Sequence, residues 1–506
     1  MGRVDLVLVN PNNKKAMFGP LSELASSEPP LWIGLTAGFL RSKGFGIRII
    51  DADAEGWGPE ETMQEIAKVD PLVVAVGALG ANPSASSTPK MPASRSLLEL
   101  LKVQAPQIKT ILFGIHPASL PEKTLQEEAV DYVCRGEAFS PFMQLLNAIK
   151  SANKSIDQNI KGLWYRQGNR IVDNGWADQI ANLDELPFVA WDMLPMDKYK
   201  AHNWHCFGHI KERSPYAVIY TSLGCIFNCT YCNIHDLYGE KPGMRYRSPE
   251  NVIEEIDLLV KTYKVRNIKF LDELFVMGTS DRLNKRIERI CDLLIERDYN
   301  LNIWAYARID TVNEEILKKV KRAGINWICY GIEGGNKGIR DKVSKGQFDG
   351  DRISRAVGLT HDTGIHILGN FMFGLPGDTL ETMQETFDMA KGINCAYANF
   401  YCTMAYPGSK LYDDSIAQGI NLPQNWMAYS QYGPDTRPMP TKYLSSADVL
   451  RFRDNAFMEY YTSPSYLNMI EQKFGLETLG HIKQMTRHKV NRKILDDKIS
   501  FSAANI

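Results

Sequence analysis

The sequence predicts an α/β protein in which a doubly wound parallel sheet is followed by an open, six-stranded partial barrel and a mostly helical C-terminal region. In residues 1–150 short apolar strands alternate with helical patterns, which favours a parallel sheet with crossover helices. In residues 211–410 strand and helix repeat with a period of roughly 35 residues, about one βαβ step. Three closely spaced cysteines follow the first strand of this second unit.

The composition is that of an ordinary globular protein, with 506 residues, 44% of them hydrophobic, and a net charge of −1. This balance provides no basic surface for nucleic acid. The longest strongly apolar run, 72–79, is too short to span a bilayer, and residues 1–10 indicate a strand and not a signal peptide. Nine cysteines form no disulfide framework, which is typical of a reducing cytoplasm. We therefore expect a cytoplasmic protein with no membrane span and no nucleic-acid partner.

The first unit, residues 1–150, is predicted to bind a ligand at the carboxyl ends of its strands. The expected strands are 4–9, 46–51, 73–77, 110–113 and 130–133, and the expected helices are 31–42, 59–67, 94–104 and 140–150. Ligands on such sheets bind at the switch point of the strand order. The loops at that edge are 10–15, 77–90, 114–120 and 135–139. No GxGxxG motif follows the first strand, so a dinucleotide is not expected.

Residues 151–210 are predicted to be an ordered connector, with a small hairpin around the turn at Gly168-Asn169 and a proline-punctuated passage after it. The second unit then shows six strands, at 217–221, 267–271, 301–305, 327–331, 367–373 and 399–404. Six steps fit an open barrel better than a closed, eight-stranded one. Chemistry in parallel barrels takes place at the carboxyl ends of the strands.

The cysteines Cys225, Cys229 and Cys232 form a CxxxCxxC pattern just after the first barrel strand. Three thiolates on one loop are able to hold three corners of a cubic 4Fe–4S cluster, which leaves the fourth iron without a protein ligand. The alternatives are a zinc site and three unrelated thiols. A structural zinc ion takes four protein ligands, and only His235 lies near enough in sequence to complete a set.

This stretch resembles the signature of the radical S-adenosylmethionine (radical SAM) superfamily, whose pattern has an aromatic residue where Tyr231 stands. The superfamily's cofactor-binding groups follow at the ends of later strands. By this resemblance Asp272 and Glu273 hold the amino group of S-adenosylmethionine, and Glu333 binds its ribose. Arg308 either holds its carboxylate or pairs with Asp310. The remaining matches are Lys345, in a Ser-Lys-Gly pattern, and Gly374 and Pro376, in a loop beside the adenine.

The first unit resembles the cobalamin-binding domain of cobalamin-dependent radical SAM enzymes. The matching segments are 9–11, 29–35, 114–117 and 133–137. The implied cobalamin contacts are Asn10, Gly80, Ser84, Gly114, His116, Gly136 and Glu137. Domains that place a histidine on cobalt carry DxHxxG after the first strand, whereas this chain has Asn-Pro-Asn-Asn-Lys at 10–14. We therefore expect no imidazole from that loop, and His116 is the nearby candidate. The alternative is a flavodoxin-like scaffold that has lost its ligand.

The resemblance implies a Rossmann-like cobalamin-binding domain over 1–150, a linker over 151–210, a radical SAM core that is a (βα)6 partial TIM barrel over 211–410, and a helical substrate-capping region over 411–506. The implied cofactors are one 4Fe–4S cluster, S-adenosylmethionine and cobalamin. The tail has no cysteine after Cys402, so no auxiliary cluster is expected, and the chain lacks the second cysteine trio of methylthiotransferases. The implied partners are a small-molecule substrate and an external electron donor such as flavodoxin or ferredoxin, and the chain is expected to be a monomer.

The implied activity is C-methylation, in which a 5′-deoxyadenosyl radical abstracts hydrogen from an unactivated carbon of a small molecule or natural-product intermediate and methylcobalamin supplies the methyl group. One alternative keeps both cofactors without methyl transfer, as in the anaerobic cyclase of magnesium-protoporphyrin ester. A second alternative is a ligand-binding sensor with a degenerate radical domain. The intact cysteines and strand-end motifs argue against the sensor.

Overall fold

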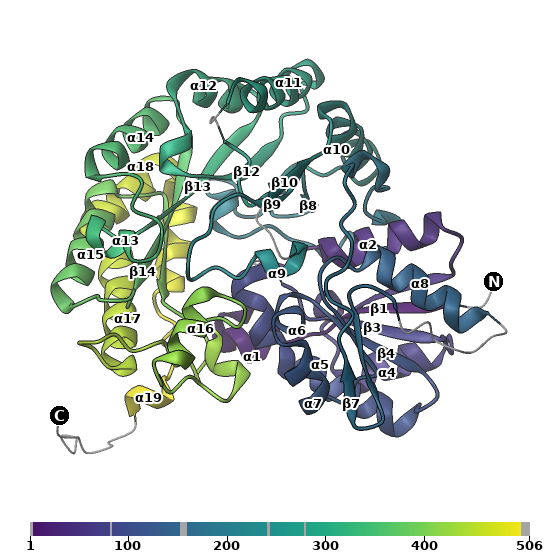
Figure 1. Ribbon diagram of the computed structural model, residues 1–506. Coiled ribbons are helices and arrows are strands. Elements are labelled where there is room, and N and C mark those ends of the chain that lie inside the picture. Colours follow the sequence, from purple (N-terminus) through teal and green to yellow (C-terminus); the bar gives the residue numbers. More distant parts are fainter. Residues whose placement is uncertain (1–3, 81–82, 152–158, 240–242, 278–279, 497–506) are drawn as a thin grey trace, which may run out of the picture.

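The computed structural model describes residues 4–80, 83–151, 159–239, 243–277 and 280–496. Two α/β units lie against one another, and helices from the C-terminal part of the chain cover one side of the second unit (Figure 1). The predicted fold class is confirmed: a parallel sheet in the first unit, a partial parallel barrel in the second, and a helical C-terminal region.

The first sheet has the strand order β2-β1-β3-β4-β5-β6-β7. Its strands are β1 Leu6–Asn10, β2 Ile47–Asp51, β3 Val73–Gly77, β4 Lys109–Phe113, β5 Tyr132–Cys134, β6 Leu163–Gln167 and β7 Arg170–Val172. The five strands β1–β5 pair in parallel, whereas β6 and β7 are antiparallel. The hairpin predicted in the connector is therefore the outer part of this sheet. The order reverses between β1 and β3, which is where doubly wound sheets bind ligands.

Helices enclose this sheet, so β1 and β3 are buried along their whole length, as expected of an internal parallel strand. The helices are α1 Lys14–Phe18, α2 Leu31–Ser42, α3 Ala52–Glu55, α4 Pro59–Ala67, α5 Pro83–Gln104, α6 Ile115–Ser119, α7 Pro121–Glu127 and α8 Phe139–Lys150. The predicted helices 31–42 and 59–67 match α2 and α4 residue for residue.

Two predicted ligand loops contain helices instead. The segment predicted as a loop from 77 to 90 is helical from Pro83 onward, although Pro89 and Pro92 lie inside α5. Packing compensates for these prolines: Ser87 and Thr88 are fully buried, and the carbonyl of Pro89 accepts a hydrogen bond from Asn13 Nδ2 at 3.1 Å. The predicted loop 114–120 contains the short helix α6.

The second unit is a six-stranded sheet in the order β15-β14-β13-β12-β11-β8, with all neighbours parallel. The strands are β8 Tyr216–Ile219, β11 Asn267–Phe270, β12 Asn302–Ala307, β13 Ile325–Glu333, β14 His366–Phe373 and β15 Tyr397–Cys402. The helices on the chain between them are α10 Pro249–Tyr263, α11 Asp281–Arg297, α12 Glu314–Arg322, α13 Lys337–Asp341, α14 Gly350–Asp362 and α15 Leu380–Ile393. Because β8 and β15 are the two edges of the sheet, the barrel is open between them.

The cysteine segment forms a small substructure of its own. The predicted first barrel strand ends at Ile219, two residues early, and the chain continues as β9 Ser222–Cys225. This strand pairs antiparallel with β10 Gly243–Tyr246, and α9 His235–Tyr238 follows the last cysteine. The first cysteine therefore lies at the end of a hairpin strand.

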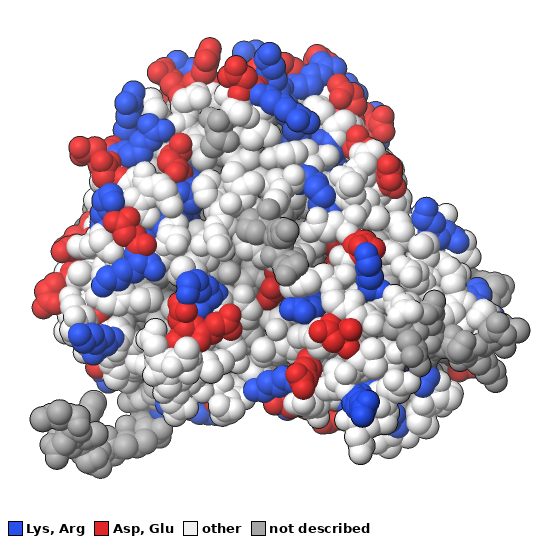
Figure 2. Space-filling model, viewed as in Figure 1, with Lys and Arg blue, Asp and Glu red and all other residues white. Residues whose placement is uncertain are grey.

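The C-terminal region consists of α16 Lys410–Ala417, α17 Ser446–Thr462, α18 Pro464–Met485 and α19 Lys493–Asp496. Tyrosines at the junction of α17 and α18 tie it to the edge of the barrel, because Tyr461 and Tyr460 donate hydrogen bonds to the carbonyls of Ala398 and Cys395 at 2.7 and 2.9 Å. Among the described helices none has the length and apolar character needed to cross a membrane. Basic and acidic side chains are interspersed over the face shown in Figure 2.

Candidate active site

The three cysteines lie on a partly exposed loop at the carboxyl end of the barrel. Cys225 ends β9, and Cys229 and Cys232 lie in the turn before α9, where the Cys232 amide donates to the Cys229 carbonyl at 3.1 Å. All three are free thiols, and burial raises the pKa of Cys225 to about 11. His235 Nε2 is 2.9 Å from the carbonyl oxygen of Phe227, so this ring supports the loop backbone. In the described parts of the chain no three His, Cys, Asp or Glu side chains converge as ligands of one metal ion.

Three free thiols in this arrangement suit a 4Fe–4S cluster, because each thiolate of a cubic cluster binds a different iron and the sulfur atoms need not meet at one point. Two cations lie near the loop: Arg308 is 3.8 Å from the centre of the Phe227 ring, and Lys345 Nζ is 3.5 Å from the Tyr231 hydroxyl. Positive charge beside a thiolate stabilises it.

Asp272 binds the start of the cysteine segment through hydrogen bonds. Its carboxylate accepts hydrogen bonds from the backbone amide of Thr221 at 2.8 Å and from the hydroxyls of Thr221 and Ser222, both at 2.6 Å. Glu273 accepts a hydrogen bond from the Tyr238 hydroxyl at 3.2 Å, and burial raises its pKa to about 7. The structure thus brings the predicted Asp-Glu pair to the cysteine hairpin, where Asp272 fixes the chain direction ahead of Cys225.

Tyr231, Glu333 and Lys345 form one hydrogen-bonded group. Glu333 Oε1 accepts hydrogen bonds from the Tyr231 hydroxyl at 3.0 Å and from Lys345 Nζ at 2.8 Å. Glu333 ends β13 at a register shift of the sheet and has a left-handed backbone (φ 66°). Because such a conformation strains a residue with a side chain, its presence at a strand end is typical of a functional position.

Arg308 is almost fully buried, with only 3% of its surface exposed. Its guanidinium donates to both carboxylate oxygens of Asp310 at 2.9 and 3.0 Å, and it lies 3.8 Å from the centre of the Phe227 ring in the cysteine loop. Its Nη1 atom is buried without a hydrogen-bond partner among the described residues. Arg308 thus makes the predicted pair with Asp310 and keeps one donor for another anionic group, which fits the carboxylate of S-adenosylmethionine.

Gly374 and Pro376 lie in the loop that follows β14. Gly374 has φ 80°, and a Cβ atom at this position would approach Val449 Cγ1 of α17 to 2.6 Å, so only glycine fits between the strand end and this helix. Asp378 closes the loop by accepting a hydrogen bond from the Leu375 amide at 2.8 Å. The adenine contact predicted here remains a prediction.

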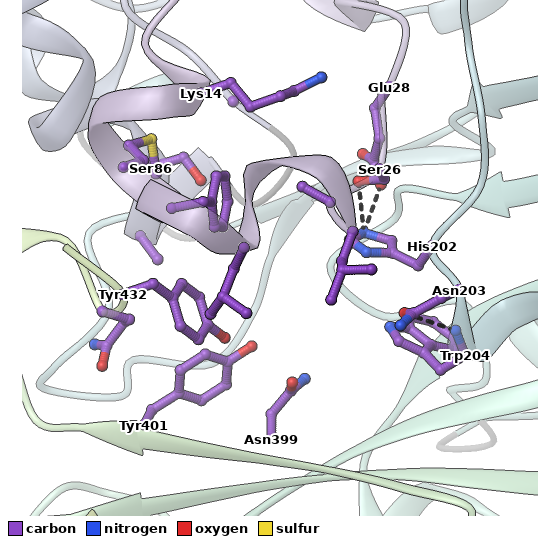
Figure 3. A pocket seen from close by; sticks show the side chains of 18 of the residues that line it. Lys14, Ser26, Glu28, Ser86, His202, Asn203, Trp204, Asn399, Tyr401 and Tyr432 are labelled. Carbon is purple, nitrogen blue, oxygen red and sulfur yellow. Dashed lines mark hydrogen bonds and ion pairs between the residues drawn. The ribbon is translucent and has the colours of Figure 1, made fainter. Parts of the chain in front are cut away.

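A cavity of about 610 Å³ lies between the first unit, the open barrel and the C-terminal helices. Each of the three parts contributes to its wall (Figure 3). Residues representative of the three walls are Asn10, Gly80 and Lys90 from the first unit, Trp304, Tyr306 and Asn370 from the barrel, and Tyr432, Arg453 and Arg492 from the C-terminal region. Tyr401 of β15 and Tyr432 lie side by side in the cavity wall, with their hydroxyl groups close to one another.

At the first unit's edge of the cavity, Asn10 is the centre of a buried polar group. Its Nδ2 donates to Asp51 Oδ1 at 2.7 Å, and its Oδ1 accepts a hydrogen bond from Lys90 Nζ. Tyr199 donates to Asp51 at 2.7 Å, and burial raises the pKa of this carboxyl to about 6. Beside it, Gly80 leaves no room for a Cβ, which would meet Ser86 Cβ at 2.4 Å. Small side chains and buried polar groups at the switch point fit a large flat ligand such as a corrin.

Four other predicted cobalamin contacts, Gly114, His116, Gly136 and Glu137, lie outside the lining of this cavity. His116 is buried with Nδ1 3.1 Å from Thr88 Oγ1 and its ring against Trp426, and burial lowers its pKa to about 3. Glu137 binds Arg245 of β10, and Gly136 precedes it with φ 94°. Gly114 has φ 131° and lies against the backbone of Ala78. The side chain of Ser84 lies outside the described residues.

Sequence reasoning missed a buried ionic group in the cavity wall. Glu28 forms ion pairs with Lys269 of β11 and with His202, both at 3.0 Å. Despite its burial, these two partners lower the pKa of Glu28 to about 2. A lysine in the apolar strand 267–271 was a usable signal, because lysine is rarely buried without a partner. Its partner, 241 residues away, had no signal in the sequence.

The fold and the site define an enzyme with a corrinoid-type sheet next to a cysteine-bearing partial barrel. The family comparison agrees: residues 219–390 match the radical SAM superfamily and residues 20–146 match the B12 binding domain. The chain belongs to the cobalamin-dependent radical SAM enzymes, whose cofactors are a 4Fe–4S cluster, S-adenosylmethionine and cobalamin.

Similar proteins include an uncharacterized methyltransferase of Pyrococcus horikoshii, 29% identical over 88% of this chain and 90% of that protein. The anaerobic magnesium-protoporphyrin IX monomethyl ester cyclase of Rubrivivax gelatinosus is 26% identical over 78% of this chain and 67% of its own. Among solved structures, the cobalamin-dependent radical enzyme OxsB with aqua-cobalamin and S-adenosylmethionine bound has a TM-score of 0.71 at 14% identity, covering 96% of this chain and 71% of that one. The methyltransferase TsrM from Kitasatospora setae, with cobalamin and a 4Fe–4S cluster bound, has a TM-score of 0.66 at 16% identity, covering 96% and 100%. At these low sequence identities the two structural similarities support a shared fold.

Proposed function

We propose that this protein is a cobalamin-dependent radical SAM C-methyltransferase that acts on an unactivated carbon of a small molecule or natural-product intermediate. The observation that carries the proposal is a cavity that is bounded by both the B12 binding domain and the radical SAM barrel. The names of relatives support it, because the Pyrococcus horikoshii protein and a 24% identical cytidylyl-2-hydroxyethylphosphonate methyltransferase of Streptomyces wedmorensis are methyltransferases.

In this proposal each cofactor has its own set of residues. Cys225, Cys229 and Cys232 hold the cluster, Arg308 and Glu333 hold S-adenosylmethionine, and Asn10, Gly80 and Lys90 face cobalamin. When bound, the cluster and S-adenosylmethionine supply one-electron chemistry and cobalamin supplies the methyl group.

The protein's own part is positioning, charge placement and exclusion of water. The Arg308 fork, held by Asp310, presents a fixed donor to a carboxylate. Glu333, held by Lys345 and Tyr231, presents a fixed acceptor to hydroxyl groups. The aromatic wall formed by Trp304, Tyr306 and Phe400 keeps water out of the cavity, which protects reactive carbon species from side reactions.

The proposal is tested by anaerobic reconstitution with cobalamin and S-adenosylmethionine that carries a trideuterated methyl group. We expect S-adenosylhomocysteine in the mixture and the labelled methyl group on extracted cobalamin, identified by mass spectrometry. Added candidate substrates are then screened for the mass gain of one labelled methyl. Production of 5′-deoxyadenosine with neither S-adenosylhomocysteine nor labelled cobalamin would contradict methyl transfer.

That contrary result would favour the second candidate, a radical enzyme that uses both cofactors without methyl transfer. The 26% identity to the anaerobic ester cyclase, over most of this chain, supports this candidate. Product mass separates the two, because a cyclisation or oxidation adds no labelled carbon.

We further propose that the enzyme works as a cytoplasmic monomer with an external electron donor such as flavodoxin or ferredoxin. The cysteine loop supports electron entry from outside the protein, because Ile226 between the first two cysteines is 48% exposed. The domain limits we propose are 1–150, 151–210, 211–410 and 411–506, with the hairpin β6–β7 of the second segment completing the sheet of the first.

A further inference from the structure

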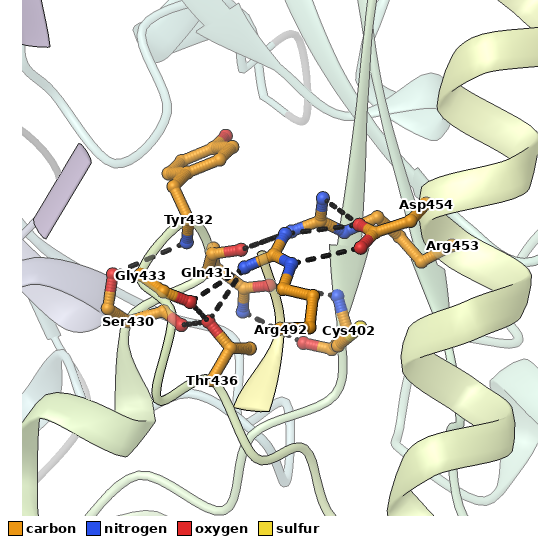
Figure 4. Close-up of polar contacts among 9 residues, drawn as sticks. All are labelled: Cys402, Ser430, Gln431, Tyr432, Gly433, Thr436, Arg453, Asp454 and Arg492. Atoms are coloured by element: carbon orange, nitrogen blue, oxygen red, sulfur yellow. Dashed lines mark hydrogen bonds and ion pairs between the residues drawn. The ribbon is translucent and has the colours of Figure 1, made fainter. Parts of the chain in front are cut away.

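The C-terminal wall of the cavity contains two buried arginines that share one carboxylate (Figure 4). Arg453 of α17 and Arg492, between α18 and α19, expose 4% and 3% of their surfaces, and both line the cavity. Asp454 accepts a hydrogen bond from Arg453 Nη1 at 2.7 Å and from Arg492 Nε and Nη2 at 2.9 and 3.1 Å. One positive charge of this arginine pair is thus left without a counter-charge among the described residues.

The other contacts of the two guanidinium groups are to neutral atoms. Both arginines donate to the Gln431 carbonyl, and Arg492 Nη1 donates to the Gly433 carbonyl and the Thr436 hydroxyl at 2.8 and 3.0 Å. Arg453 Nε is buried with no hydrogen-bond partner among the described residues. An uncompensated buried charge is costly, so a site of this kind is stabilised by an anion that enters the cavity.

The cavity's other buried cations differ from the arginine pair, because each has its own carboxylate nearby. Lys269 pairs with Glu28 at 3.0 Å. Lys90 donates a hydrogen bond to Asn10, whose side-chain amide in turn donates to the Asp51 carboxylate. Excess positive charge in the buried wall is therefore concentrated at Arg453 and Arg492.

The arginine pair is attached to the catalytic end of the barrel. Gln431 accepts from the Cys402 amide and donates to the Cys402 carbonyl, both at 2.9 Å, which ties the loop at 430–436 to the carboxyl end of β15. Reacting groups in parallel barrels lie at this end. Between the pair and the barrel interior the wall is largely aromatic, with Tyr401 and Tyr432 facing the cavity.

We propose that Arg453 and Arg492 form a binding site for a carboxylate or phosphate group of the substrate, so that the substrate class is an anionic molecule with an apolar or aromatic body. Asp454 neutralises one of the two guanidinium charges and competes with an anion for them. The anion binds the Nε donor of Arg453, which has no partner among the described residues, and Arg492, whose donors are all in use, contributes its charge. This inference rests on the proposed function for the identity of the ligand as substrate. Cobalamin also carries a phosphodiester. The anion that the arginines bind therefore has two candidate sources, the substrate and cobalamin, and the experiment must distinguish them.

The test measures binding of phenyl phosphate, with phenol as the neutral match, by calorimetry on anaerobically reconstituted holoprotein that contains cluster and cobalamin. We expect phenyl phosphate to bind and phenol not to bind. Arg453→Gln should weaken phenyl phosphate binding by roughly tenfold or more, because one charged hydrogen-bond donor is lost. Asp454→Asn should strengthen binding by roughly tenfold, because the internal competitor of the anion is removed. Arg487→Gln, at an exposed arginine of the same segment, should leave binding unchanged.

The Asp454→Asn variant keeps the test decisive if Arg453→Gln does not fold. A purely structural role for Asp454 predicts lower stability and no gain in anion affinity, and that result would overturn the proposal. Equal binding of phenol and phenyl phosphate to the wild type would also overturn it.

Cobinamide, which lacks the nucleotide tail and its phosphodiester, separates the two sources. If the arginines bind the substrate, Arg453→Gln leaves the affinities for cobalamin and cobinamide unchanged. A loss of cobalamin affinity with unchanged cobinamide affinity would assign the site to the cofactor and overturn the substrate class. No step of this binding assay requires catalysis. If the protein binds phenyl phosphate but transfers no methyl group, the proposed function is refuted and the anion site is not.

Discussion

Cys229 lies where two cations reach the cluster loop, and neither is close to it in sequence. Arg308 comes from the end of β12 and Lys345 from the segment after α13. Each is held by an acid of its own, Asp310 for Arg308 and Glu333 for Lys345. The negative charge of three thiolates is therefore placed beside charges that are already fixed, so little rearrangement is needed when a cluster is bound.

Replacing Cys229 by alanine removes one corner of the cluster. We expect Cys229→Ala, reconstituted anaerobically, to lose most of the iron and sulfide that the wild type retains, about four irons per chain. Iron analysis and the visible absorption spectrum provide the measurement. Cys291→Ala is the matched control, because Cys291 is a buried thiol of α11. Equal iron content in the two variants would contradict the assignment of the loop.

Arg308→Lys preserves the charge and removes the planar fork. Lysine offers a point charge and cannot bind Asp310 and a second carboxylate with the same geometry. We expect S-adenosylmethionine to bind roughly tenfold more weakly to the cluster-containing variant. Equilibrium dialysis measures the affinity, and Arg297→Lys, at the exposed end of α11, is the control. An unchanged affinity would show that Arg308 only supports Asp310.

Residues that belong to short sequence motifs were predictable. Contacts between residues far apart in the sequence were not. The spacing of Cys225, Cys229 and Cys232 indicates a cluster because all three lie on one loop. Glu28 and Lys269 carry no such signal, since their pairing exists only after two units of the chain have met.

At the scale of elements, α5 shows where local reasoning failed. Gly, Ala, Ser and Pro at 77–90 predict a loop by intrinsic preference, yet the chain is helical from Pro83 because small buried side chains pack closely there. The strands of both sheets were predictable to within a few residues, since apolar runs of this length between helical patterns have few other solutions.

The turn between β4 and α6 depends on a glycine. Gly114 has φ 131°, and an added Cβ would lie 2.3 Å from the Ala78 carbonyl oxygen. We expect Gly114→Ala to lower the free energy of unfolding of the apoprotein by about 2–3 kcal/mol, from backbone strain and steric overlap together. The control Gly44→Ala also has a positive φ but open space around it, and it should lose only about 1 kcal/mol. Urea unfolding compares the two, and equal losses would contradict the steric argument.

Glu137 joins the B12 binding domain to the cysteine hairpin. Its carboxylate accepts from Arg245 Nη1 of β10 at 3.1 Å and from the Ile180 amide at 3.2 Å. Burial raises the pKa of Glu137, an effect that Arg245 only partly offsets. This residue was predicted as a cobalamin contact, and the geometry supports a role in holding the two units together.

We expect Glu137→Gln to lower the free energy of unfolding by about 3 kcal/mol, because the Arg245 charge is left without its partner. Asp178→Asn breaks the exposed pair with Lys161 and should change stability by less than about 1 kcal/mol. Chemical denaturation of the apoproteins measures both. A small effect for both variants would show that the buried pair contributes nothing between the two units.

For the whole molecule, the order of elements was predictable and the arrangement of the units was not. Strand and helix periods are local properties, so two sheets and a helical tail follow from the pattern. The hairpin β6–β7, in contrast, pairs with β5, a contact that depends on the edge of a sheet formed earlier in the chain. The cavity has the same origin, since its walls come from segments hundreds of residues apart.

The folded protein should become less stable as the pH falls, because two buried histidines are neutral in the folded state. Burial lowers the pKa of His116 and His205 to about 3, whereas an unfolded histidine titrates near its ordinary value of about 6.5. Between these values the unfolded chain binds more protons, so each histidine destabilises the folded state as the pH falls from about 6.5 to 3. Between pH 7 and pH 5 the wild type should lose about 2 kcal/mol more of its free energy of unfolding than the His116→Gln variant. His209→Gln, at an exposed position, should leave the slope unchanged, and equal slopes for wild type and His116→Gln would contradict the account.

The cavity wall includes residues near position 10 and residues near position 490 of the same chain. During synthesis on the ribosome the first group emerges hundreds of residues before the second. The nascent chain is therefore able to form the first sheet long before it possesses a closed cavity. A corrinoid that reaches this protein while it is being translated meets an open surface, and it becomes enclosed only when the last arginine of the wall has left the exit tunnel.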